Sequence, residues 1–166
     1  MELPDRKHPR LKEYDYSQAG YYYVTIHVAD KTICLSRVGR GLAPADAAIT
    51  LSAMGKVAEQ QLLLLEKRYP FLRIDTYVIM PTHVHAILVF ENEVAGASSH
   101  PTLMDVVCAY KSLTTRECNR IFQTPGRKIF QTSFYESVLR NESAYRECWQ
   151  YIDENPRKWL LNPEDL

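Results

Sequence analysis

Two apolar runs that follow one another almost without a break constrain the fold of this chain more than any other feature. The first occupies residues 72–80 and the second residues 84–90, with Pro81 and Thr82 at the junction. Short apolar runs bounded by a proline are typical of buried strands, and a junction this short leaves room only for a tight turn. The sequence therefore predicts two adjacent strands, and we expect both to lie in the middle of a sheet.

The chain before these runs adds a strand and a helix. Residues 21–28 are rich in aromatic and β-branched side chains and follow a glycine, which predicts a strand. We expect a short partner strand at residues 33–35. After a stretch punctuated by glycine and proline, apolar residues recur at spacings of three and four between Leu51 and Leu65. This period predicts a helix that ends before Pro70.

The chain after the two runs begins with an expected exposed loop at residues 91–100. Thr102 can then cap a helix that extends to residue 121, because Asp105 follows three positions later. Residues 134–139 predict a further strand. The last helix is capped by Asn141, and we expect it to end at Pro156 because the residue before a proline is pushed out of the α region.

The order of these elements predicts an α+β fold. Strand, helix, strand, strand, helix, strand, helix is the order of a ferredoxin-like or RRM-like domain, with helices packed on one face of a mainly antiparallel sheet. The chain has 166 residues, of which 46% are hydrophobic, and contains neither an internal repeat nor a linker. We therefore expect residues 1–166 to form a single domain.

Location and redox state follow from what the sequence contains. It has no apolar run long enough to span a bilayer, and its first residues are charged where a signal peptide is apolar. We expect a cytoplasmic protein that does not enter membranes. Its widely separated cysteines form no CxxC pair and are expected to be reduced and mostly buried; they are Cys34, Cys108, Cys118 and Cys148.

The charge of the chain bears on nucleic-acid binding without deciding it. The formal net charge is zero, although phosphate binding depends on lysine and arginine. Residues 111–140 carry six basic side chains against two acidic ones. That local excess fits a nucleic-acid contact and fits an ordinary solvated surface equally well.

The most informative triplet in the sequence is His-Val-His at residues 83–85. Side chains alternate along a strand, so two imidazoles spaced by two residues point the same way and can bind one metal ion. Two unrelated histidines, one in the core and one at a strand end, explain a bare His-x-His at least as well.

Tyr151 and Asn155 are the corresponding candidates on the last helix. They are four residues apart and share one helix face. A tyrosine hydroxyl can attack a phosphodiester, and an asparagine oxygen can bind Mg²⁺ or Mn²⁺. Tyr151 also fits an apolar stripe with Ala144 and Cys148, and Asn155 can be an ordinary residue at the end of a helix.

Several motifs, taken in order, resemble the REP-associated tyrosine transposases, domesticated relatives of single-tyrosine insertion-sequence transposases in the HUH endonuclease class. Two motifs carry most of the resemblance: Met-Pro-Thr-His-Val-His at residues 80–85 and Tyr-Ile-Asp-Glu-Asn-Pro at residues 151–156. The similarity runs from Arg10 to Trp159. Its further segments are residues 10–17, 20, 23–26, 111–112, 134–136, 140–142 and 158–159.

The resemblance implies roles for four residues. His83 and His85 would bind a divalent cation, Mg²⁺ or Mn²⁺, and Asn155 would complete the metal site. Tyr151 would be the nucleophile that forms a 5′-phosphotyrosine on single-stranded DNA. No nucleotide cofactor is implied. Thr82 departs from the asparagine usual in the family, which leaves the implied metal ligands intact.

The resemblance also implies a substrate. The family acts on hairpins in repetitive extragenic palindromes that are flanked by a short single-stranded guide sequence. Exposed tyrosines among residues 21–23 could stack on unpaired bases, although alternate ones must face the core. Residues 129–131 lack a tryptophan common in the family, which puts local DNA contacts in doubt. We expect a monomer rather than a homodimer, with DNA backbone contacts from Lys111, Arg116, Arg127 and Lys128.

Two other functions stay open on the sequence. A ferredoxin-like sheet that carries aromatic side chains also suits a non-catalytic RNA- or DNA-binding module. A small metal-dependent hydrolase of a low-molecular-weight phosphate ester would use the histidines and leave Tyr151 structural.

Overall fold

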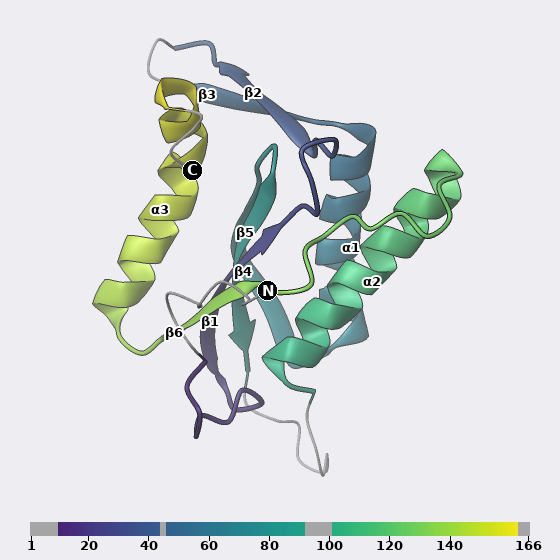
Figure 1. Cartoon of the computed structure of the whole chain (residues 1–166). Coiled ribbons are helices and arrows are strands. Elements are labelled where there is room, and N and C mark those ends of the chain that lie inside the picture. Colours follow the sequence, from purple (N-terminus) through teal and green to yellow (C-terminus); the bar gives the residue numbers. More distant parts are fainter. Residues whose placement is uncertain (1–9, 44–45, 92–100, 163–166) are drawn as a thin grey trace, which may run out of the picture.

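A four-stranded antiparallel sheet forms the centre of the molecule (Figure 1). The computed structural model describes residues 10–43, 46–91 and 101–162. The strands lie in the order β4-β5-β1-β6, with bounds β1 (Gly20–His27), β4 (Leu72–Ile79), β5 (His83–Phe90) and β6 (Tyr135–Leu139). The expectation that both apolar runs lie in the middle is correct for β5 and wrong for β4. β5 pairs with β1 on its other side, whereas β4 is an edge strand.

Helices cover both faces of this sheet. α1 (Ala53–Arg68) and α2 (Leu103–Phe122) lie on one face, and α3 (Glu142–Leu161) crosses the other (Figure 1). The chain is thus an α+β protein with the ferredoxin-like order of elements in its main sheet, and the predicted fold class is confirmed. The expected packing of the helices on one face is wrong, because α3 packs against the smaller core on the opposite face.

Alternation along the strands sends two sets of side chains to two cores. On β1, Tyr22 and Val24 are buried in the larger core beneath α1 and α2. Their neighbour Tyr23 belongs to a smaller core that also includes Ile87 of β5 and Ile152 of α3. The strand period of two therefore decides which residues face α3.

Local signals at two helix starts agree with the sequence. Thr102 and Asp105 form the predicted capping box at the start of α2. At the start of α1, the Ser52 hydroxyl accepts a hydrogen bond from the Gly55 amide at 3.0 Å. Gly55 is required there because a Cβ atom would lie 1.8 Å from the Leu35 carbonyl oxygen.

A two-stranded ribbon, β2 (Ser36–Arg40) paired with β3 (Ala47–Leu51), stands where the sequence suggested a loop. The expected strand at residues 33–35 is wrong: Ile33 and Leu35 are buried loop residues, and the Leu35 amide donates to the Pro81 carbonyl. The ribbon packs against the smaller core through Val38 and Ile49, close to the C-terminal half of α3 (Figure 1).

α3 continues past Pro156 to Leu161, so its expected end at the proline is wrong. The proline removes one backbone donor. Trp159 nevertheless packs against the smaller core, and Lys158 forms an ion pair with Glu154 at 3.0 Å, so the last turn is held by side chains.

Three further expectations concern a loop, the cysteines and membrane helices. Of the loop expected at residues 91–100, residues 92–100 lie outside the described residues. All four cysteines are free thiols as expected, but Cys34 and Cys108 are exposed, and Cys118 alone of the four is fully buried. None of the helices in the described ranges has the length and apolar character of a membrane span.

Candidate functional site

His83 and His85 lie side by side on the sheet face that α3 covers. They belong to the central strand β5, are 2% and 4% exposed, and their ring centroids are 4.5 Å apart. Side chains alternate between the two faces of a strand, so His83 and His85 point to the same face, and Val84 lies in the core on the other face.

Hydroxyl groups hold one nitrogen of each imidazole. Nδ1 of His85 lies 2.9 Å from both the Tyr23 hydroxyl and the Thr25 hydroxyl, and Nδ1 of His83 lies 3.1 Å from the Thr82 hydroxyl. Nε2 of His85 is buried with no hydrogen-bond partner among the described residues. Histidines that bind metals are oriented in this way, with the second nitrogen held by a neighbouring polar group.

Burial keeps both imidazoles neutral. It lowers the pKa of His83 to about 4, with a contribution from His27 in the same direction and an opposing polar contact from Asn155. Burial, followed by the nearby His83 and His27, lowers the pKa of His85 to about 2. A neutral imidazole has a lone pair available for a cation at neutral pH.

Asn155 reaches the histidines from α3. The residue is 0% exposed, and both its Nδ2 and Oδ1 atoms lack a hydrogen-bond partner among the described residues. A buried amide without partners is costly, which is a reason to look for a ligand at this position. Its influence on the pKa of His83 places its side chain next to that imidazole.

The donors at this point are two imidazoles and one amide. Within the described part of the chain, no three His, Cys, Asp or Glu side chains gather as a metal-binding group. A cation here would therefore depend on His83, His85 and the Asn155 oxygen. Two nitrogens and one hard oxygen suit Mn²⁺ and related divalent ions, and Nε2 of His85 and Oδ1 of Asn155 are both uncommitted, so these residues fit a cation.

Tyr151 completes the group from the same helix. It is 36% exposed, and its ring centroid lies 5.4 Å from that of His85 in an edge-to-face arrangement. The Lys158 ammonium lies 5.3 Å from the centre of the tyrosine ring. A cavity of about 490 Å³ opens beside Tyr151, lined by Tyr23, Thr25, His27, His83, His85, Tyr135, Glu147, Cys148 and Tyr151.

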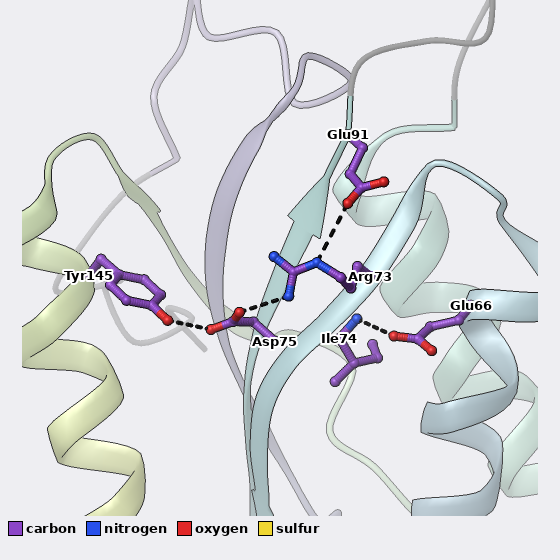
Figure 2. Close-up of polar contacts among 6 residues, drawn as sticks. All are labelled: Glu66, Arg73, Ile74, Asp75, Glu91 and Tyr145. Atoms are coloured by element: carbon purple, nitrogen blue, oxygen red, sulfur yellow. Dashed lines mark hydrogen bonds and ion pairs between the residues drawn. The ribbon is translucent and has the colours of Figure 1, made fainter.

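A polar clasp ties the first half of α3 to the edge of the sheet (Figure 2). The Tyr145 hydroxyl donates to the Asp75 carboxylate at 2.7 Å, and Arg73 holds the other carboxylate oxygen at 2.8 Å. Asp75 lies in a β-bulge of β4, where the freed amide of Ile74 donates to Glu66 of α1. A bulge can re-aim a side chain, and here the Asp75 carboxylate meets Tyr145 of α3, the helix that also carries Tyr151.

Two of the four predicted DNA-contact residues lie together. The Lys111 ammonium donates to the Thr132 carbonyl and that of Lys128 to the Thr132 hydroxyl, both at 2.8 Å. Burial lowers the pKa of Lys111, and the neighbouring charges of Lys128 and Arg10 lower it further. Arg10, which the sequence did not single out for this role, belongs to the same basic cluster.

The other two candidates are separate. Arg116 is exposed on α2, and Arg127 in the following turn donates to the Thr32 hydroxyl at 3.0 Å. α2 covers the face of the sheet opposite the histidines (Figure 1). Neither residue lines the cavity beside Tyr151.

The three consecutive tyrosines divide as a strand requires. Tyr22 is 0% exposed in the larger core, and Tyr23 is buried against His85. Tyr21 is 39% exposed and contacts Tyr145 edge to face, with 5.4 Å between the ring centroids.

Several site residues were missed by sequence reasoning. His27 pairs directly with His83 across β1 and β5, and their ring centroids are 5.4 Å apart. Tyr23, Thr25 and His27 alternate along β1, so their common face could have been read from the sequence. Their position opposite the histidines depends on the register between strands, which the sequence does not give.

No family model matches the chain. An uncharacterised protein of Haemophilus influenzae is 27% identical over 172 residues, which cover 93% of this chain and 89% of that protein.

Two solved structures share the fold. The structure of a REP-associated tyrosine transposase bound to a REP hairpin has a TM-score of 0.62 and 20% identity, covering 91% of this chain and 74% of that chain. A transposase candidate from Deinococcus radiodurans has a TM-score of 0.51 and 17% identity, covering 89% of this chain and 97% of that chain. The resemblance that the motifs indicate is thus confirmed at the level of the fold.

Proposed function

We propose that this chain, which shares the fold of a REP-associated tyrosine transposase, is a metal-dependent single-tyrosine nuclease and strand transferase of single-stranded DNA. One observation carries the proposal: Tyr151 lies within one cavity beside two neutral imidazoles, with a buried amide that lacks partners next to them. An ordinary core would not leave His85 Nε2 and both Asn155 side-chain atoms without hydrogen bonds.

Tyr151 is the nucleophile in this proposal. Its hydroxyl oxygen forms a bond to phosphorus, the bond from phosphorus to the 3′-oxygen breaks, and the phenolic proton is balanced by the proton on the released 3′-hydroxyl. The 5′-phosphotyrosine retains the energy of the broken bond, so a 3′-hydroxyl can reverse the attack and join DNA strands. The cavity at Tyr151 is open to solvent, which gives a DNA strand access.

His83, His85 and Asn155 would hold the cation, Mg²⁺ or Mn²⁺. When bound, a divalent cation supplies Lewis-acid polarisation of the scissile phosphate. The residues around it keep the ligands in place: Thr25 orients His85 and Thr82 orients His83 through the Nδ1 contacts. Thr82, where relatives usually have asparagine, thus takes an orienting position without entering the ligand set.

Hairpin DNA is the proposed substrate, because a structural neighbour is a REP-associated tyrosine transposase bound to a REP hairpin. Lys111 and Lys128 form a basic cluster with Arg10, which suits contacts to phosphates of the stem. Arg116 and Arg127 are proposed to extend the contact along the α2 side. We also propose a cytoplasmic location and a monomer as the active unit, since one chain brings Tyr151 next to His85.

The test is incubation of the purified protein with labelled hairpins from repetitive palindromes of its own genome, in Mn²⁺ or Mg²⁺, followed by a denaturing gel. A slowly migrating covalent band that requires the cation supports the proposal. Binding without adduct or cleavage would indicate a non-catalytic binding module. Turnover of small phosphate esters without any adduct would indicate a small hydrolase instead.

A further inference from the structure

The cavity beside Tyr151 extends further than a cation and one phosphate group require. Its volume of about 490 Å³ falls in the range of sites that hold a whole organic ligand. Its lining residues include His83, His85 and Tyr135 of β6. Tyr135 pairs with Thr25 in the register of β1 and β6, so both side chains lie on the face beneath α3.

Away from Tyr151 and the proposed cation, the charge of the lining disfavours a run of DNA backbone. Neither lysine nor arginine is among the described residues that line the cavity, and Glu147 contributes a carboxylate from α3. Consecutive phosphates would meet repulsion there, because proteins bind them with cations and hydrogen-bond donors. An uncharged, flat group meets no such penalty.

Tyr135 offers an aromatic surface for such a group. It is 36% exposed, and its ring is braced edge to face by Tyr23, with ring centroids 6.0 Å apart. Proteins that bind single-stranded DNA stack bases on aromatic side chains, and a braced ring loses little freedom when a base binds. Tyr21, the exposed tyrosine that the sequence suggested, packs against Tyr145 and does not line the cavity.

We propose that this cavity holds one unpaired nucleobase of the DNA strand, stacked on Tyr135, from a nucleotide next to the phosphate that Tyr151 attacks. The inference rests on the proposed function, because it takes the strand to pass Tyr151. It goes further in assigning a base-binding site and the residue that forms it. Sequence selection next to the cleavage point would then depend on Tyr135 as well as on hairpin pairing.

The experiment places 2-aminopurine at each single-stranded position of a hairpin and measures its fluorescence on binding to the full chain in Mn²⁺. Stacking quenches the probe, and we expect strong quenching at one position. Tyr135→Ala should remove it and weaken binding about tenfold, the order of one base–aromatic contact. Tyr135→Phe should keep both, and Tyr135→Leu, which is apolar but not aromatic, should behave like the alanine variant.

Trp149→Ala is the matched control. Trp149 is 43% exposed on α3 but does not line the cavity, so its removal should leave the quenching unchanged. Equal quenching in wild type and Tyr135→Ala, or a leucine variant as effective as phenylalanine, would overturn the inference. Quenching that depends on Tyr135, without an adduct on any hairpin, would keep the base site and refute the nuclease. Adduct formation together with quenching that is unchanged in Tyr135→Ala would support the nuclease and refute the base site.

Discussion

Two buried imidazoles and an amide without partners are the central feature at the scale of single residues. Folding takes His83 and His85 out of water with no compensating charge, and each loses the ability to be protonated at ordinary pH. Cores seldom retain groups that cost stability in this way unless they bind something. A divalent cation would recover that cost.

The depressed pKa values predict how stability depends on pH. An unfolded histidine has a pKa near 6.5, whereas burial in the folded protein lowers the pKa of His83 to about 4 and that of His85 to about 2. Their contribution is therefore present above pH 6.5 and is lost as the pH falls. With chelator present, each histidine should lower the free energy of unfolding by about 2 kcal/mol as the pH falls from 7 to 5.

Denaturant unfolding at a series of pH values measures this loss. His85→Gln should reduce the pH dependence by about half of the histidine contribution. His27→Gln should change it less, because the His27 side chain is exposed and its effect on the pKa of His83 and His85 is secondary to that of burial. A slope that is identical in wild type and His85→Gln would contradict the account.

Much of the site could be predicted at this scale. Alternation placed His83 and His85 on one face, and helical spacing placed Tyr151 and Asn155 on another. Residue spacing alone does not predict that these two faces meet, because the side of the sheet that α3 covers depends on long-range packing. Only the family resemblance implied it. The role of Tyr135 was hidden for the same reason, since it lies opposite Thr25 only through the register of β1 and β6.

At the scale of elements, α3 carries the proposed nucleophile, so its attachment to the sheet matters. Two tyrosine–carboxylate hydrogen bonds link β4 to the helices on the two faces of the sheet. Tyr145 of α3 donates to Asp75 at 2.7 Å, and Tyr77 of β4 donates to Glu59 of α1 at 2.9 Å. Both are phenol–carboxylate bonds of similar length, which makes them a matched pair.

Tyr145→Phe should slow adduct formation about tenfold, equal to about 1.4 kcal/mol, because α3 loses its bond to the bulge. Hairpin affinity should stay the same, since Tyr145 does not line the cavity. Tyr77→Phe should lower the free energy of unfolding by about 1–2 kcal/mol and leave the rate of adduct formation unchanged. Rapid-quench kinetics and thermal unfolding of both variants distinguish these outcomes, and equal rate losses would indicate general destabilisation.

The elements that sequence reasoning missed have physical explanations. The stretch of glycine and proline at residues 39–44 hid the β2–β3 ribbon, yet Gly39 pairs with Ala48 within it. The end of α3 was misplaced because the rule for residues before proline is local. Contacts of Trp159 with the smaller core and the Glu154–Lys158 pair act over a longer range and keep the helix intact.

At the scale of the whole molecule, both faces of the sheet are covered. An RRM-like module reads RNA on an exposed sheet face. Here α1 and α2 occupy one face and α3 the other, and Tyr22 and Tyr23 are buried. Neither covered face offers such a surface, so in our proposal the strand that Tyr151 attacks passes the cavity lined by Tyr135 and Tyr151. This arrangement favours the proposed nuclease over an RRM-type module.

Because α3 packs on its own sheet, one chain should suffice for cleavage. A mixture of Tyr151→Phe with His83→Ala contains an intact tyrosine in one variant and intact ligands in the other. We expect the mixture to form no adduct, as each chain lacks one part of its own site. Adduct recovered in the mixture on a denaturing gel would mean that chains exchange α3 and that a dimer is the active unit.

Peptide mapping of the protein–DNA adduct tests the central claim most directly. Wild-type protein is incubated with hairpin DNA and Mn²⁺, digested with nuclease and protease, and analysed by mass spectrometry. The account predicts a 5′-nucleotide phosphate on the peptide that contains Tyr151, lost in Tyr151→Phe and in the presence of chelator. An adduct at another residue, or one that persists in Tyr151→Phe, would contradict it.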